Sequence, residues 1–80
     1  MLDTPKQPID VIVYYPEDLH LELSSKVLEA VGIECDSSGA QFGQRMIRFP
    51  FERRKDAKGA VERVGLVHSS IKTTIWRRRI

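Results

Sequence analysis

The sequence predicts an α+β domain whose elements follow the order strand, helix, strand, strand, helix, strand. Three observations predict it. A run of β-branched and aromatic residues at 9–15 lies between two prolines, as strands often do. Two segments, 16–32 and 56–65, repeat apolar residues at helical spacing. Two others, 44–52 and 71–78, have the alternation or the β-branched content of strands.

The first strand is predicted at residues 9–15, IDVIVYY, between Pro8 and Pro16. Its residues are apolar on both faces except at Asp10, which is typical of a strand in the middle of a sheet. We therefore expect it to be central.

The first helix is predicted over PEDLHLELSSKVLEAVG, residues 16–32. Pro16 and the two acidic residues after it suit a first turn, and Gly32 suits a C-terminal cap. At 100° per residue, five apolar side chains fall in one stripe about 120° wide, which we expect to face the core. They are Leu19, Leu23, Val27, Ala30 and Val31.

The second and third strands are predicted on either side of a turn rich in serine and glycine. A short strand is expected at Ile33–Asp36, followed by that turn. In QRMIRFPFE, residues 44–52, two sets of side chains alternate and the first is the better core face. The first set is Ile47, Phe49 and Phe51, and the second is Met46, Arg48 and Pro50.

The second helix is predicted to begin at Asp56 as its N-terminal cap and to end before Gly65. Its apolar residues have the i, i+3, i+4, i+7 spacing of one helix face, at Ala57, Ala60, Val61 and Val64. The last strand is expected around Ile71 to Arg78, because Val, Ile, Thr and Trp dominate there.

This order of elements, with right-handed crossovers, predicts the ferredoxin-like βαββαβ sandwich, in which two helices cover one face of a four-stranded antiparallel sheet. Eighty residues suffice for one such domain with a thin core. We therefore assign residues 1–80 to a single domain, with 1–8 as an N-terminal extension.

The passage FPFERRKDAKGAVERVG, residues 49–65, resembles the strand-to-helix passage of RNA-recognition-motif domains. The positions that match that pattern are Phe51, Asp56, Ala57, Ala60, Val61 and Val64. That family stacks RNA bases on aromatic residues of an octapeptide in its third strand. With Phe51 aligned to the last octapeptide position, Met46 and Arg48 stand where the two outward aromatics belong. The resemblance therefore implies the ferredoxin-like fold, which amino-acid-binding ACT-type domains share, without the base-stacking octapeptide.

The charges are divided unequally along the chain. Residues 1–40 carry eight acidic and two basic side chains, a net charge of −6, whereas residues 41–80 carry eleven basic and three acidic, a net charge of +8. Such a division indicates a surface of two signs, and hence a partner of one sign or association between opposite patches. Mutual pairing of the two helices would explain it equally well.

No pattern of catalytic, cofactor or metal-binding residues is found. Cys35, His20 and His68 are too far apart in sequence for a zinc motif, and the serines have no histidine and carboxylate in a triad arrangement. The five glycines match neither a dinucleotide loop nor a phosphate loop. We therefore expect no enzyme activity, no cofactor and no metal. The longest uncharged apolar run, 11–15, is too short to span a bilayer, so a cytoplasmic location is expected.

Alternation along the strands predicts a helix-free sheet face that is rich in aromatic, apolar and cationic side chains. Together with the arginine-rich end of the chain, this face supplies the predicted partner-binding residues: Tyr14, Met46, Arg48, Lys72, Trp76, Arg77, Arg78 and Arg79. A secondary basic patch is predicted on the second helix and its entry, at Arg53, Arg54, Lys55, Lys58 and Arg63.

These residues favour a non-enzymatic binding protein that occupies the surface of a partner, either a protein or a nucleic-acid–protein complex. Its size and polarised charge are similar to those of small inhibitors encoded by phages and mobile elements, such as anti-CRISPR proteins. The alternatives are direct nucleic-acid binding through the same face and the basic C-terminal strand, an ACT-like sensor of a small molecule, and a homodimer that covers the open sheet face.

Overall fold

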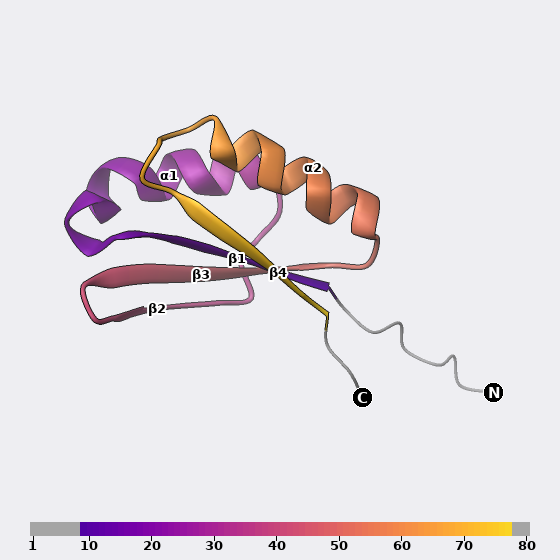
Figure 1. The fold of residues 1–80 in the computed structure, drawn as a ribbon, viewed down its shortest axis with the longest axis horizontal. Helices are drawn as coiled ribbons and strands as arrows, with labels where there is room; N and C mark the ends of the chain where they lie inside the picture. Colours follow the sequence, from indigo (N-terminus) through magenta and orange to yellow (C-terminus); the bar gives the residue numbers. More distant parts are fainter. Residues whose placement is uncertain (1–8, 78–80) are drawn as a thin grey trace.

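The computed structural model describes residues 9–77, which form one layer of four strands and one layer of two helices (Figure 1). In chain order the elements are β1 (Ile9–Pro16), a 3-10 turn η1 (Glu17–Leu19), α1 (His20–Val31), β2 (Ser37–Gln41), β3 (Gln44–Phe51), α2 (Arg54–Gly65) and β4 (Lys72–Arg77). This order confirms the predicted one. The predicted extension, residues 1–8, lies outside the described residues.

The strands form one four-stranded sheet in the order β2-β3-β1-β4, and every neighbouring pair is antiparallel. Figure 1 shows α1 and α2 side by side on one side of this sheet. The arrangement is the predicted ferredoxin-like one, with β1 in the middle as its apolar character on both faces indicated. No helix of residues 9–77 lies on the opposite side of the sheet, and we call that side the open face.

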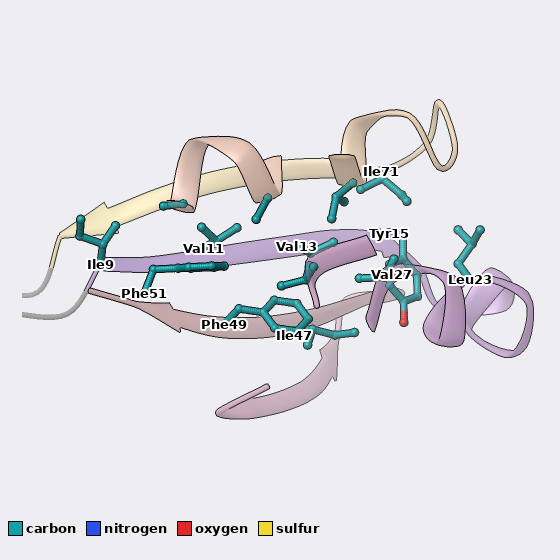
Figure 2. Close-up of a cluster of buried hydrophobic side chains, with 14 residues drawn as sticks. Ile9, Val11, Val13, Tyr15, Leu23, Val27, Ile47, Phe49, Phe51 and Ile71 are labelled. Atoms are coloured by element: carbon teal, nitrogen blue, oxygen red, sulfur yellow. The ribbon is translucent and has the colours of Figure 1, made fainter. Parts of the chain in front are cut away.

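The core lies between the sheet and the helices (Figure 2). Val11 pairs with Phe49 on β3, Val13 pairs with Ile47, and all four side chains are buried. They pack against the predicted stripe of α1, whose Leu23, Val27 and Val31 are buried, and against Ala57, Ala60 and Val64 of α2. The helical periodicities therefore identified the buried faces of both helices.

The C-terminus of α1 ends as predicted on Gly32, which has the left-handed φ of 84° and donates its N–H to the Leu28 carbonyl oxygen at 3.0 Å. A second group caps the same end. Arg63 of α2 donates from Nε to the Ala30 carbonyl oxygen at 2.7 Å and from Nη2 to the Val31 carbonyl oxygen at 3.2 Å. These carbonyls have no partner within α1, and the positive guanidinium complements the negative end of the helix dipole.

The N-terminus of α2 differs from the prediction. The helix begins at Arg54, the cap position is Arg53, and no side chain makes a capping hydrogen bond there. Asp56 lies in the first turn, where its carboxylate still complements the positive end of the helix dipole. The predicted capping role of Asp56 is therefore wrong, and the helix begins about one turn earlier than predicted.

The position predicted for the second strand is also wrong. Residues 33–36 connect α1 to β2, and the strand itself is Ser37–Gln41, which was predicted to be a turn. The turn lies further on, at Phe42 and Gly43, whose φ angles of 53° and 76° are both positive. Two positive φ angles in a two-residue loop are the mark of a type I′ hairpin, whose twist matches that of the strands. Pairing with β3 thus overrides the weak strand propensity of serine and glycine.

The hairpin of β2 and β3 is attached to the rest of the chain at both ends. At the turn, the Glu17 N–H donates to the Gly43 carbonyl oxygen at 2.9 Å, and at the other end the Asp36 N–H donates to the Arg48 carbonyl oxygen at 2.8 Å. None of the five side chains of β2 is buried. Neither of the two described helices has the length and apolar character needed to cross a membrane.

Candidate functional site

The open face presents its side chains in rows that run across the sheet. The first row holds Trp76, Asp10 and Pro50 on β4, β1 and β3. The second holds Thr74, Ile12, Arg48 and Ser37, and the third holds Lys72, Tyr14, Met46 and Gly39. The predicted residues Tyr14, Met46, Arg48, Lys72 and Trp76 therefore all lie on this one face.

Trp76 is the most exposed aromatic side chain of these rows, with 60% of its surface accessible. Its neighbour across β1 is Asp10, which is only 4% exposed although it also points away from the helices. Arg48 Nε lies 3.9 Å from Asp10 Oδ2, so a cation of the second row is paired with this carboxylate. The positive charge of Arg48 is thereby partly balanced within the face itself.

The middle of the open face is hollowed. Ile12 is only 8% exposed, because the larger side chains around it shield it. A hollow of ≈ 130 Å³ is lined by Ile12, Ser37, Ser38, Gly39, Met46 and Arg48. The wall of the hollow formed by β2 is low because Gly39 has no side chain and Ser37 has a small one. This part of the open face is therefore a shallow, mainly apolar depression with Arg48 at its border.

Phe42, at the tip of the β2–β3 hairpin, extends this surface and was not among the predicted residues. It is 94% exposed, and it lines a second hollow, of ≈ 200 Å³, with Tyr14, Gln41, Gln44 and Met46. A bulky residue with positive φ is an outlier, and asparagine or glycine is usual at its position in a type I′ turn. The weak sequence signal for this turn is the pair Phe-Gly directly before the strand-forming run of β3.

Of the arginine-rich end of the chain, the structure describes the residues up to Arg77. Arg77 ends β4, and the predicted site residues Arg78 and Arg79 lie outside the described residues. Ile75 points to the helix side, as expected from its pairing with Val11, but it is 41% exposed. It is a poorer core residue than the alternation suggested because β4 is an edge strand, with no further strand beyond it.

The predicted secondary basic patch contains two kinds of residue. Arg53, Arg54, Lys55 and Lys58 are exposed at the entry and on the outer side of α2. Arg63 is also solvent-accessible, but its guanidinium binds the last carbonyls of α1. The first four therefore remain available as a surface charge cluster, whereas Arg63 has an intramolecular role.

A polar cluster that the sequence did not indicate lies where β1 enters α1. The Tyr15 hydroxyl is 2.7 Å from His20 Nδ1, the two rings are stacked, and Arg45 Nη2 is 2.8 Å from His20 Nε2. A guanidinium only donates, so the His20 ring accepts from Arg45 in this arrangement. Arg45 Nε also lies 3.7 Å from Glu17 Oε2. Burial raises the pKa of Tyr15 above its usual 10.0, and the nearby Arg45 partly opposes this effect.

This cluster joins the end of β1, the start of α1 and the start of β3, and we interpret it as structural. Within residues 9–77, no three His, Cys, Asp or Glu side chains are grouped so as to hold a metal ion. Cys35 is exposed in the connection before β2. No protein-family model, no curated protein and no solved structure matches the chain.

Proposed function

We propose that the chain is a non-enzymatic binding protein whose open face docks onto a partner protein. The observation that carries the proposal is the exposure of Trp76 on a helix-free sheet face, in one surface with Tyr14, Met46 and Arg48. Tryptophan, tyrosine, methionine and arginine are the residues most enriched in the buried centres of protein–protein interfaces.

The shape of this face supports the same conclusion. Its apolar side chains border two adjacent hollows that share Met46. Trp76 stands on one side of them, on β4, and Phe42 on the other, at the hairpin tip. A surface with projecting aromatic side chains and shallow hollows between them is more complementary to the surface of another protein than to a small molecule, which binds in an enclosed pocket.

The charges on the face favour a protein over a nucleic acid. A nucleic acid is bound mainly through several cations that replace the counterions of its phosphates. In the described rows the cations are Arg48 and Lys72, and Arg48 is paired with the buried Asp10. Asp10 adds a negative charge beside Trp76. A base stacked on Trp76 would bring its phosphate close to this carboxylate, and the two negative charges would repel each other. Nucleic-acid binding would need further cations, from the basic C-terminal strand or from the entry of α2.

Inhibition of a nucleic-acid-handling complex, as in the small phage inhibitors that the sequence resembles in size and charge, is one use of such a face. Docking of the open face onto a protein subunit of that complex would block a surface that the complex needs for its function. The exposed charges of Arg53, Arg54, Lys55 and Lys58 would then lie on the other side of the sheet, free to meet its nucleic acid.

The test compares capture of partner proteins from native lysate by the unchanged chain, by Trp76→Ala and by Leu21→Ala. Leu21 is a matched control because it is an exposed, large apolar residue on α1, away from the open face. We expect Trp76→Ala to lose a captured protein that Leu21→Ala retains. Equal capture by both variants would exclude the open face, and binding of a labelled single-stranded oligonucleotide that weakens steeply between about 50 and 200 mM salt would support nucleic acid instead.

A further inference from the structure

β2 is an edge strand, and among residues 9–77 it shows little of the usual protection against pairing with another strand. It lies at one end of the sheet order and has the sequence SSGAQ, without charge or proline. Edges of natural sheets are generally blunted by lysine, proline, a bulge or a covering element. The other edge, β4, carries Lys72. No side chain of β2 is buried.

The hairpin geometry determines which backbone groups of β2 face outward. Gln41 and Gln44 flank a two-residue turn and form the last pair of the ladder. In such a hairpin this pair is hydrogen-bonded, and hydrogen-bonded pairs alternate with non-bonded ones. Gly39 therefore bonds to β3, whereas Ser38 and Ala40 direct their N–H and C=O groups away from the sheet. These four groups are the ones that a further strand pairs with.

The hollow of the open face lies directly beside this edge. A Cβ at Gly39 would meet nothing within 4 Å, so the space above it is open. Neighbouring strands lie about 4.8 Å apart, so a long side chain on a strand beside β2 can lean over Gly39 toward Met46 of β3, on the near side of the hollow, whereas Ile12 of β1 lies farther in. The ≈ 130 Å³ of this hollow suits one branched aliphatic side chain.

Arg48, whose charge Asp10 balances only partly, adds a preference for a carboxylate at the same place. It lines the hollow, and its buried Nε atom makes no hydrogen bond to any described residue, since the 3.9 Å to Asp10 is too long for one. Ser37 lies next to Arg48 in the β2–β3 ladder. A carboxylate on an added strand, opposite Ser37, would reach toward this guanidinium across a small side chain.

We propose that the β2 edge receives an extended segment of a partner protein as a fifth strand, with an aliphatic residue opposite Gly39 and an acidic residue opposite Ser37. A second copy of the chain fits less well. Its β2 would offer only Ser37, Gly39 and Gln41 on this side, and none of them fills an apolar hollow. The inference rests on the proposed function in one respect, namely that the protein docked on the open face supplies the segment.

The test uses a capped peptide, acetyl-Thr-Glu-Thr-Leu-Thr-Glu-Thr-amide, which places leucine between two glutamates in either strand direction. It is added to isotope-labelled protein and followed by NMR. We expect amide hydrogen exchange to slow at Ser38 and Ala40, whereas Gly39 and Gln41, already bonded to β3, change little. A peptide with glycine in place of leucine should bind about tenfold more weakly or worse, because it leaves the hollow empty.

Two variants of the protein test separately the contributions of the β2 backbone and of the hollow to peptide binding. Ala40→Pro removes an outward N–H that β3 does not use, and it should abolish peptide binding. Gly39→Val fills the hollow and keeps every backbone donor, so it should weaken binding even if the proline variant folds poorly. Ala40→Val, on the opposite face of the same strand, is the matched control for Gly39→Val and should retain binding.

The outcomes distinguish this inference from the proposed function. Trp76→Ala should bind the peptide unchanged, because Trp76 lies on the far edge strand. Absence of peptide binding, or slowed exchange at β4 instead of Ser38 and Ala40, would overturn the edge proposal and leave docking through Trp76 standing. Dimerisation of the unchanged chain with the same protection of Ser38 and Ala40 would also overturn it, in favour of a second copy.

Discussion

The Arg63 side chain of α2 donates a 2.7 Å hydrogen bond from Nε to the carbonyl oxygen of Ala30, in the last turn of α1. One residue of the apparent basic patch therefore holds the two helices together. We predict that Arg63→Ala lowers the free energy of unfolding by about 1 kcal/mol, the net value of such a bond at a solvent-accessible site. Urea denaturation measures the loss. Lys58→Ala, which removes an exposed charge from the same helix, should change stability by less than about 0.5 kcal/mol. Equal effects of the two substitutions would contradict the capping role.

Phe42 should be unfavourable for the fold and useful for binding. Its φ of 53° suits asparagine or glycine in this turn, so Phe42→Asn should raise the free energy of unfolding by about 0.5 to 1 kcal/mol. The same change removes an aromatic ring that is almost fully exposed, and it should weaken capture of the partner protein. Thermal unfolding and the capture assay, run on one preparation, check both. A variant that is more stable and binds equally well would show that the ring has no part in the interface.

Trp76 reports directly on the open face, because it is the single tryptophan of the chain. With 60% of its surface exposed, its fluorescence should be quenched readily by acrylamide and shift to shorter wavelength when the partner docks. Trp76→Ala should change the free energy of unfolding by less than about 1 kcal/mol. A large loss of stability, or a blue-shifted spectrum in the free protein, would mean that the ring is buried among the helices and that the strand register is wrong.

The raised pKa of Tyr15 gives stability a defined dependence on alkaline pH. Because burial makes the folded state hold the phenol proton more tightly than the unfolded chain does, this contribution is fully present below the ordinary tyrosine pKa of 10.0. It is lost as the pH rises through the higher pKa of the folded state. The free energy of unfolding of the unchanged chain should therefore fall above about pH 10.

Urea denaturation between about pH 8 and pH 11, compared among variants, isolates this effect from other titrating groups. Tyr15→Phe should lower stability near neutral pH, since it loses the 2.7 Å contact with His20, and should show a shallower decline at high pH. Tyr14→Phe, on the more accessible open face, should keep the full decline. Parallel curves for Tyr15→Phe and the unchanged chain would contradict the assignment.

Periodic patterns that extend over many residues predicted most of the fold. The errors came from short segments without such a pattern. The apolar stripes of α1 and α2 and the alternation of β3 each extend over several residues, so single exceptions do not hide them. β2 has no such pattern because none of its side chains is buried. Only the hairpin partner and the turn at Phe42 and Gly43 determine where it lies, and both depend on contacts outside the segment.

The candidate site could be predicted to a similar degree. Alternation placed Tyr14, Met46, Arg48 and Trp76 on the same face, because it depends only on position along a strand. It could not predict that Asp10 is buried on that face, since its exposure depends on the size of its cross-strand neighbours. The capping role of Arg63 was also beyond the sequence, because its acceptors lie on another helix.

The two backbone bonds that attach the hairpin, from Glu17 to Gly43 and from Asp36 to Arg48, have a consequence for alternative pairings of β2. In most strands a slip by one residue is prevented by the cost of exposing the core side chains. β2 buries none, so a slip there would expose almost no apolar surface. It would instead break both attachments and the type I′ turn at once. The alignment of this strand is therefore guarded by main-chain hydrogen bonds at its two ends.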